Sequence, residues 1–161
     1  MGEATCALVL VAAILTMCAV TGPAGGQPAG GVTRSVAEEV VCSSVDIRNN
    51  VTQFEKLANC TVVEGAVQIV LFDRTTENDY ANLTFPNLRE ITHYLLVWRV
   101  KGLKSLAQLF PNLSVIRGNT LFANTALAIF ENNRLQEIGL RSLTHILHGS
   151  IVIYKNYSEY P

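Results

Sequence analysis

Two cysteines and a set of glycan acceptor patterns are the residues of this chain whose types and spacing point to chemistry. Cys60 follows Cys42 by 18 positions, and the two other cysteines lie near the amino terminus. The Asn-x-Ser/Thr pattern, which accepts N-linked glycans on exported proteins, occurs at Asn50, Asn59, Asn82, Asn112 and Asn156. Several such patterns in a chain of 161 residues favour a glycosylated extracellular surface.

Residues 1–27 have the layout of a signal peptide. An almost unbroken apolar run, Ala7–Val20, precedes small and turn-forming residues up to Gly26, as in an apolar core followed by a cleavage region. No basic residue precedes the run and Glu3 stands there instead, so a signal anchor is the alternative. Cleavage is favoured because a membrane span needs about 20 apolar residues, and the run Ala7–Val20 is shorter than that. We expect an extracellular, secreted protein, or a plasma-membrane ectodomain, without membrane insertion by the remaining segment.

Export decides how the cysteines are interpreted. Cys6 and Cys18 fall in the leader, and an even pair, Cys42 and Cys60, then enters an oxidising compartment, where a disulfide is the default. Zinc binding is the alternative, but two thiols without neighbouring His or Cys ligands make a poor site. We therefore predict a Cys42–Cys60 disulfide, no metal site and no other cofactor.

The remaining polar residues do not predict an enzyme. The 12 basic and 13 acidic residues nearly balance, so nothing favours nucleic acid or an anionic membrane as a partner. His145 and His148 stand three apart but lack a third metal ligand. Glu38 and Glu39 are adjacent rather than a facing catalytic pair, and no serine has the context of a nucleophile.

After residues 28–40, which we expect to form a flexible lead-in, the chain repeats. Phe85-Pro86-Asn87-Leu88 recurs as Phe110-Pro111-Asn112-Leu113, and Gly102–Leu106 recurs as Gly139–Leu143. Similar units open at Val63, Ile91, Ile116 and Ile146, at separations of 28, 25 and 30 residues. Periods of this length with regular leucines indicate a solenoid, in which each coil buries its face against its neighbours.

Each repeat contains one short run of β-branched and aromatic residues, which is typical of a strand. The runs cover residues 66–72, 94–100, 126–131 and 150–155. Leucines that recur at threes between Leu103 and Ile116 suit a short helix or helical turn. One strand per coil, stacked at corresponding positions, predicts a parallel sheet in a β-rich solenoid, either a β-helix or a leucine-rich-repeat-like fold.

Side chains alternate along a strand, so each run divides into two faces. The uniformly aliphatic face is assigned to the core: Val67, Ile69, Leu71, Leu95, Val97, Leu127, Ile129, Ile151 and Ile153. The other face carries Gln68, Val70, Phe72, Leu96, Trp98, Ala128, Phe130, Val152 and Tyr154. Aromatic rings on successive coils of this second face favour an exposed binding surface. A covering loop, or a sheet buried on both faces, is the alternative.

Several motifs share one order and spacing with a known family. These are Val41-Cys42 with Asp46–Asn50, Leu109–Leu113 with Val115–Gly118, and Ile129–Glu131. Together they resemble the first L domain of the insulin receptor and insulin-like growth factor receptor family, in particular an invertebrate member in a truncated or secreted form. The resemblance implies a right-handed β-helix whose sheet face binds hormone. It assigns residues 41–161 to a receptor L domain that we expect to be C-terminally incomplete.

The resemblance also implies which residues contact hormone. It carries a ligand-binding role to Asp46, Arg48, Asn49, Gln68, Leu71, Leu96, Phe122, Phe130, Glu131 and Lys155. The exposed face adds Val70, Trp98 and Tyr154. The chain departs from the family's pattern at Asp73, Ala123, Thr125, Ala128 and Val152. Where such a departure removes a hot-spot ring, the expected cost is about 2 kcal/mol of binding energy.

Two functions follow from these observations. The first is extracellular recognition of an insulin-like peptide on the parallel sheet, as part of a receptor or as a secreted form that sequesters the hormone. The alternative is a structural role, in which the domain pairs with another receptor chain and binds no hormone. The motifs of the family's kinase are not found in this chain.

Overall fold

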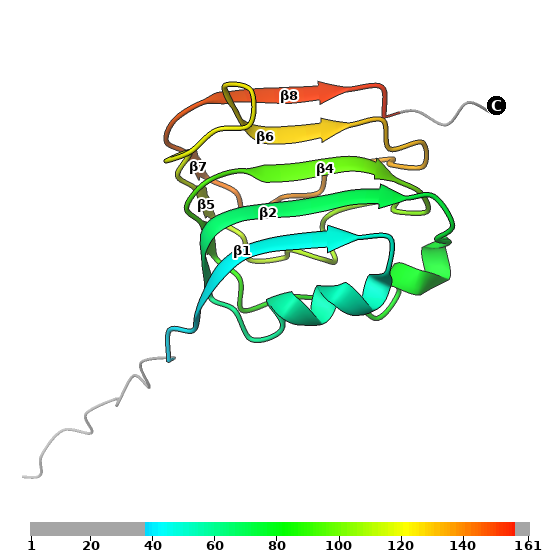
Figure 1. Ribbon diagram of the computed structural model, residues 1–161, viewed down its shortest axis with the longest axis horizontal. Coiled ribbons are helices and arrows are strands. Elements are labelled where there is room, and N and C mark those ends of the chain that lie inside the picture. The colour runs from blue at the N-terminus through cyan, green and yellow to red at the C-terminus, as the bar shows by residue number, and fades with distance from the viewer. Residues whose placement is uncertain (1–37, 157–161) are drawn as a thin grey trace, which may run out of the picture. The chain divides into compact units, whose positions relative to one another are not determined.

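The computed structural model describes residues 38–156, which form a parallel β-solenoid (Figure 1). Its main sheet consists of β1 (Val41–Arg48), β2 (Val62–Phe72), β4 (Leu95–Val100), β6 (Thr125–Phe130) and β8 (Ser150–Tyr154). Each strand pairs in parallel with the next in that order. The predicted solenoid class and the four predicted strand runs are confirmed, whereas the strand β1 was not predicted.

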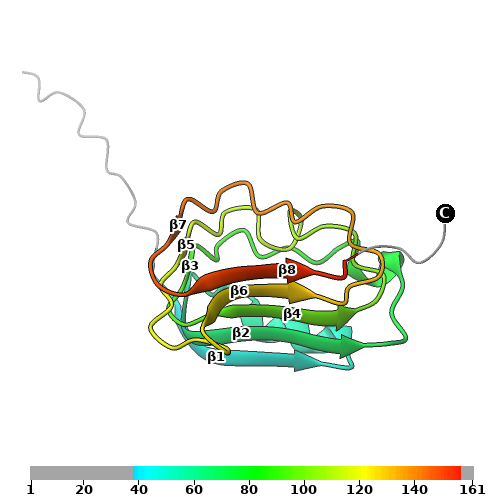
Figure 2. The same cartoon turned by 90° about the horizontal axis from the view of Figure 1, so that it is seen from above.

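A second, narrower ladder runs beside the main sheet. It contains β3 (Glu90–Ile91), β5 (Val115–Ile116) and β7 (His145–Ile146), stacked in parallel on the first two residues of β2. Figure 2 shows these short strands near the amino-terminal ends of the main-sheet strands. The sequence repeats opened at these positions, but two-residue strands carry too little alternation to be recognised as strands.

Short 3₁₀ helices and turns close the coils. The helix η1 spans Val51–Leu57, and the Asn50 side chain caps it by accepting a hydrogen bond from the Thr52 backbone nitrogen at 3.0 Å. The helix η2 spans Glu77–Tyr80. No helix forms between Leu103 and Ile116. The leucine spacing there reflects a chain of turns that points its leucines inward, with one helical bond from the Phe110 nitrogen to the Leu106 carbonyl at 2.9 Å.

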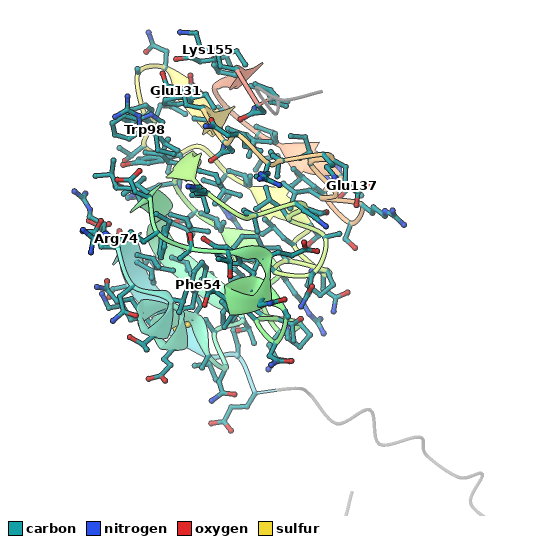
Figure 3. The ribbon with its side chains drawn as sticks, turned by 90° about the vertical axis from the view of Figure 1, so that its right-hand side faces the viewer. Phe54, Arg74, Trp98, Glu131, Glu137 and Lys155 are labelled. Atoms are coloured by element: carbon teal, nitrogen blue, oxygen red, sulfur yellow. A yellow bond between two sulfur atoms is a disulfide. The ribbon has the colours of Figure 1, made fainter. Side chains whose placement is uncertain are left out.

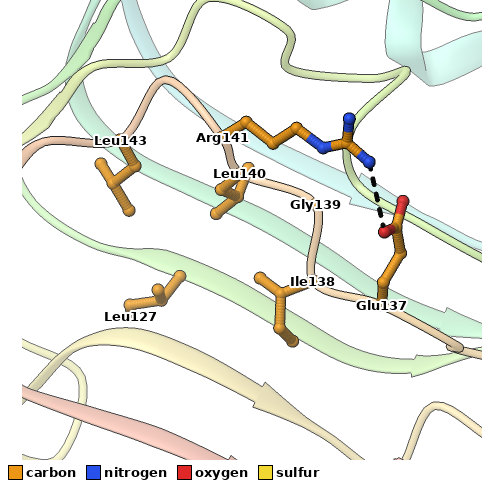
Figure 4. Close-up of a pocket in the computed structure, with 7 residues that line it drawn as sticks. All are labelled: Leu127, Glu137, Ile138, Gly139, Leu140, Arg141 and Leu143. Carbon is orange, nitrogen blue, oxygen red and sulfur yellow. Dashed lines mark ion pairs between the residues drawn. The ribbon is translucent and has the colours of Figure 1, made fainter.

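The strand register aligns the aliphatic core side chains coil upon coil. One column contains Val45, Val67, Leu95, Leu127 and Ile151, and the next contains Ile47, Ile69, Val97, Ile129 and Ile153. Their members from β1 to β6 are at most 5% exposed. Ile151 and Ile153 are 54% and 49% exposed, because no strand among residues 38–156 pairs with the far edge of β8. A separate recess is lined by Leu127 and by residues of the segment that follows β6, namely Glu137, Ile138, Gly139, Leu140, Arg141 and Leu143 (Figure 4).

Two residues at the end of β2 lie opposite to the side that alternation predicted. Leu71 was assigned to the core but is half-buried on the outer face, and Phe72 was assigned to the outer face but is 1% exposed within the core. The cause is the left-handed backbone of Leu71, with φ of +62°. This conformation breaks the period of two, so that Phe72 pairs with Val100 and both point inward.

Aromatic rings fill the core beside η1. Phe54, labelled in Figure 3, projects from η1 and is fully buried. Its ring centroid lies 5.9 Å from those of Phe72 and Phe85 and 6.3 Å from that of Tyr80. Burial raises the pKa of Tyr80 to about 12. Phe54 therefore joins the first coil to the second.

The predicted disulfide is confirmed. Cys42 and Cys60 are bonded, with their Cα atoms 5.8 Å apart, and the bond joins the start of β1 to the residues that precede β2. Residues 1–37 and 157–161 lie outside the described part of the chain, so the signal peptide, the lead-in up to Ala37 and the incomplete carboxyl end stay predictions. Between residues 38 and 156, no helix has the length and apolarity needed to cross a bilayer.

Candidate functional site

The outward side chains of the main sheet form two columns. One contains Asp46, Gln68, Leu96, Ala128 and Val152, and the other contains Arg48, Val70, Trp98, Phe130 and Tyr154. Because parallel pairing keeps equivalent residues side by side, residues from five coils meet on one surface. We call this surface the sheet face.

Three aromatic rings stack along the second column. The Trp98 and Phe130 ring centroids are 6.0 Å apart, and those of Phe130 and Tyr154 are 5.0 Å apart with planes 10° from parallel. Trp98 and Phe130 are half-buried, whereas Tyr154 is 44% exposed. The predicted alignment of the rings on successive coils is therefore confirmed, and the ring column reaches the solvent.

Smaller apolar side chains form the floor next to the rings. Val70, Leu96 and Ala128 make a cluster separate from the main core and are 3%, 4% and 2% exposed. Leu71 and Tyr94 pack against this cluster as half-buried residues. Val70 and Leu96, both predicted to bind ligand, therefore lie beneath their neighbours and shape the face more than they present surface.

Charged residues lie where the strands leave the sheet face. Glu131 accepts hydrogen bonds from the Trp98 Nε1–H group at 3.0 Å and from the Arg99 Nε–H group at 2.9 Å. The Arg99 guanidinium carbon is 5.2 Å from the centre of the Trp98 ring. Lys155 places its Nζ atom 5.9 Å from the centre of the Tyr154 ring. Trp98, Glu131 and Lys155 lie at the same edge in Figure 3.

The backbone explains why these charges gather. One residue at the equivalent place on each of four successive coils has a left-handed backbone. These are Leu71 (φ +62°), Arg99 (φ +52°), Glu131 (φ +57°) and Lys155 (φ +52°). The left-handed conformation is uncommon outside glycine, and here it recurs at the ends of the main-sheet strands β2, β4, β6 and β8. It turns the chain off the sheet and leaves these side chains beside the outer face.

The bonds to Glu131 make the ring column sensitive to acid. The Trp98 hydrogen bond, followed by the Arg99 hydrogen bond, lowers the pKa of Glu131 below the ordinary 4.5. A lowered pKa means that the stability from these bonds is present above pH 4.5 and is lost as pH falls through the lower folded-state value. We expect the fluorescence of Trp98, the one tryptophan of the chain, to change below pH 4.5.

Glu131→Gln is the control for this prediction, because glutamine can accept the Trp98 bond but carries no titrating carboxyl. Its tryptophan emission should stay level over the interval in which the wild-type emission changes. An identical acid transition in both proteins would show that another carboxyl controls the environment of Trp98.

The opposite end of the sheet face is formed around Tyr94. The Gln68 Nε2 atom donates a hydrogen bond to the Tyr94 hydroxyl at 2.7 Å, and the Tyr94 and Phe122 ring centroids are 5.8 Å apart. Phe122 is 38% exposed. Tyr94 joins two predicted ligand-binding residues but was not itself predicted. The signal was available, because residues 94, 96 and 98 share one phase of alternation.

The residues predicted at the edge lie on β1 and just beyond it. The Arg48 Nε atom is 2.6 Å from Asp46 Oδ1 in an exposed ion pair, and Asn49 follows with a φ of +59°. In the strand register Asp46 is opposite Gln68, and Arg48 is opposite Val70. These three residues therefore extend the sheet face by one coil but lie three coils away from Phe130.

Comparison with known proteins decides the family. The model of the receptor L domain family matches residues 59–159. The chain belongs to this family.

The L domain is also similar to parts of much longer receptors. An insulin-like peptide receptor of Branchiostoma lanceolatum is 54% identical over 127 residues, which cover 79% of this chain and 9% of that receptor. The insulin receptor of Xenopus laevis is 53% identical over 116 residues, 72% of this chain and 8% of that protein. A putative molluscan insulin-related peptide receptor of Lymnaea stagnalis is 48% identical over 117 residues, 73% and 7% respectively. The resemblance to the insulin receptor family is confirmed, and the chain spans less than a tenth of these relatives.

The five residues that we expect to depart from the family's pattern lie at several depths of the L domain. Ala128 belongs to the buried floor, and Thr125 is 4% exposed with its Oγ1 atom 3.2 Å from Ser150 Oγ. Val152 is half-buried in the first outward column, whereas Asp73 and Ala123 are exposed. Small residues at the floor leave the neighbouring rings as the main apolar surface of the face.

The remaining predicted chemistry is distributed around the L domain. Four acceptor asparagines, Asn50, Asn59, Asn82 and Asn112, are exposed, whereas Asn156 is half-buried. The Nδ1 atom of His145 lies 2.8 Å from Thr144 Oγ1, and that of His148 lies 3.0 Å from the Arg117 carbonyl oxygen. The described residues contain no group of three His, Cys, Asp or Glu side chains that could hold a metal ion.

Proposed function

We propose that this L domain is an extracellular recognition module that binds an insulin-like peptide on the sheet face. The observation that supports this most is the ring column of Trp98, Phe130 and Tyr154. Large rings that are partly exposed, rimmed by charge and supported from below are typical of binding hot spots. Relatives about half identical to this chain include receptors named for insulin and insulin-like peptides.

The charges around the rings favour a peptide over a purely apolar ligand. Glu131 fixes Trp98 and Arg99, and Lys155 lies over Tyr154, so both signs of charge border the apolar surface. Such a rim selects a partner with complementary charge and disfavours others. Hormone recognition of this kind would serve receptor signalling, or sequestration if the domain is secreted alone.

A structural role is the second candidate, and the open end of the solenoid favours it. Leu147, Ile151 and Ile153 are half exposed there, and the far edge of β8 has no partner strand within residues 38–156. Unpaired edges and exposed apolar residues promote association with another chain. In this role the domain would pair with a second receptor chain and would not bind hormone.

Titration calorimetry and size-exclusion chromatography distinguish the two functions. Insulin and an insulin-like growth factor serve as probe peptides against the purified domain. Hormone recognition predicts saturable heat with at least one peptide and a monomer in its absence. A structural role predicts no saturable heat and an apparent mass that rises with protein concentration. The second pair of results would overturn the proposed function.

A further inference from the structure

Asn132 is a fully buried polar residue directly after Glu131 of the sheet face. It is 0% exposed, and its side-chain amide is satisfied on every side. Its Oδ1 atom accepts a hydrogen bond from the Val100 backbone nitrogen at 2.9 Å. Its Nδ2 atom donates to the Val97 carbonyl at 3.1 Å and to Asn156 Oδ1 at 3.0 Å.

Asn156 repeats this arrangement one coil later. Its Oδ1 atom accepts from the Asn132 backbone nitrogen at 3.1 Å as well as from Asn132 Nδ2, and its own Nδ2 atom donates to the Ile129 carbonyl at 2.8 Å. Val97 and Ile129 are register partners. The two asparagines are therefore rungs of one amide ladder that joins β4, β6 and the end of β8.

We propose that the Asn132–Asn156 ladder positions Glu131 and Lys155, the charged residues at the edge of the sheet face. The same ladder keeps Asn156 unglycosylated in the folded domain, although Asn156 lies in an acceptor pattern. That Glu131 and Lys155 take part in ligand recognition rests on the proposed function, whereas the absence of a glycan on Asn156 does not. Asn156 is thus a positioning residue, distinct from the four exposed acceptor asparagines.

The positioning role follows from the backbone. Glu131 and Lys155 immediately precede the two ladder residues, and both have left-handed backbones with φ of +57° and +52°. Such conformations persist only where the surrounding structure fixes them. The ladder bonds hold the residue after each of these turns, because Asn132 and Asn156 cannot leave without exposing or orphaning buried amide groups.

The modification conflicts with the ladder for a chemical reason. Transfer from a glycosyl diphosphate donor forms a bond between Nδ2 and the sugar C1, breaks the C1–oxygen bond, releases the diphosphate and gives one Nδ2 proton to a base. The nitrogen must be free to react and must then carry a sugar ring. In Asn156 this nitrogen donates to a main-chain carbonyl within the coil, while Oδ1 of the same amide holds the buried Asn132 through two bonds.

Asn112 provides an internal comparison. Its Nδ2 atom also donates to a carbonyl, that of Pro86 at 2.8 Å, but the residue is exposed. Its amide can give up this single bond to water at little cost. A bonded nitrogen therefore does not by itself exclude a glycan. The combination of the nitrogen bond with the support of a buried neighbour is what distinguishes Asn156.

The test uses the full chain secreted from a eukaryotic cell line that adds N-linked glycans. Peptide mapping by mass spectrometry should find glycan on the exposed sites Asn82 and Asn112 and none on Asn156 in the folded, secreted fraction. Ser158→Ala, which removes the acceptor pattern but keeps the asparagine, should leave the glycan pattern unchanged. A glycan on Asn156 in protein whose β8 amides are protected from exchange would overturn the proposal.

Hydrogen exchange tests the ladder independently of any peptide. Asn156→Ala should increase exchange in residues 150–155 at least tenfold, whereas Ser158→Ala should match the wild type. Asn156→Asp, which keeps the acceptor oxygens but lacks the donor, should show a smaller increase. Unchanged exchange in both Asn156 variants would overturn the positioning role. Neither readout depends on hormone binding, so failure of the proposed function would be distinguishable.

Discussion

Replacing Trp98 and Phe130 together by alanine is expected to abolish detectable binding of an insulin-like peptide. Each ring is half-buried in the ring column, and Trp98 also donates to Glu131. Hot-spot rings contribute about 2 kcal/mol or more each, so the double variant should weaken binding by about a thousandfold. Titration calorimetry with the peptide that the wild type binds measures the loss.

The fold should survive this double substitution, because both rings lie outside the main core. Circular dichroism and thermal unfolding establish this for the same samples. Trp98→Phe, which keeps an aromatic ring in the column, should bind within about tenfold of the wild type. Arg141→Glu changes a side chain that is 80% exposed and outside the sheet face, so its affinity should be unchanged. Wild-type affinity in the double variant would disprove binding at the ring column.

Phe54→Ala is expected to have the largest effect on stability. The ring is fully buried and contacts Phe72, Tyr80 and Phe85. Deleting a buried phenylalanine side chain costs about 3 to 5 kcal/mol through lost transfer energy and the cavity that remains. Domains are stable by only about 5 to 15 kcal/mol, so much of the stability would be lost. The midpoint of guanidinium unfolding should fall accordingly.

Phe122→Ala is the matched control for Phe54→Ala. It makes the same chemical change at a residue that is 38% exposed and contacts the ring of Tyr94. Its cost should stay near 1 kcal/mol, since little more than an aromatic pair is lost, at about 0.5 to 1.5 kcal/mol. Equal destabilisation by both variants would show that the core beside η1 does not carry the fold.

Much of the fold could be predicted because it is encoded locally and then repeated. The alternation at Ile69, Val97 and Ile129 specified which side of each strand is buried, and the structure aligns these residues in one column. The pairing of Cys42 with Cys60 followed from there being two cysteines after the leader. Each of these inferences needs only a few neighbouring residues or a count.

The reversal at Leu71 and Phe72 could not be predicted in this way. It depends on the left-handed backbone of Leu71. Glycine often adopts this conformation but leucine rarely does, so the residue type gave no signal. Arg99 is a second example: continuing the alternation of Leu95 and Val97 would put residue 99 on the inner side, but Arg99 bonds to Glu131 from the edge of the sheet face. A single dihedral angle therefore changes the side of the strand on which a side chain lies.

The repeat, the two faces of the sheet, the disulfide and the resemblance to receptor L domains could therefore be inferred from the residues alone. The three-dimensional arrangement was needed to show that the ring centroids of Trp98 and Phe130 are 6.0 Å apart and those of Phe130 and Tyr154 5.0 Å apart. It was also needed to show that Tyr94 joins Gln68 to Phe122 and that Asn132 and Asn156 form a ladder. The difference lies in how far apart along the sequence the interacting residues are. Periodicity acts within a strand, whereas these contacts join residues 24 to 32 positions apart and exist only once the coils are stacked in register.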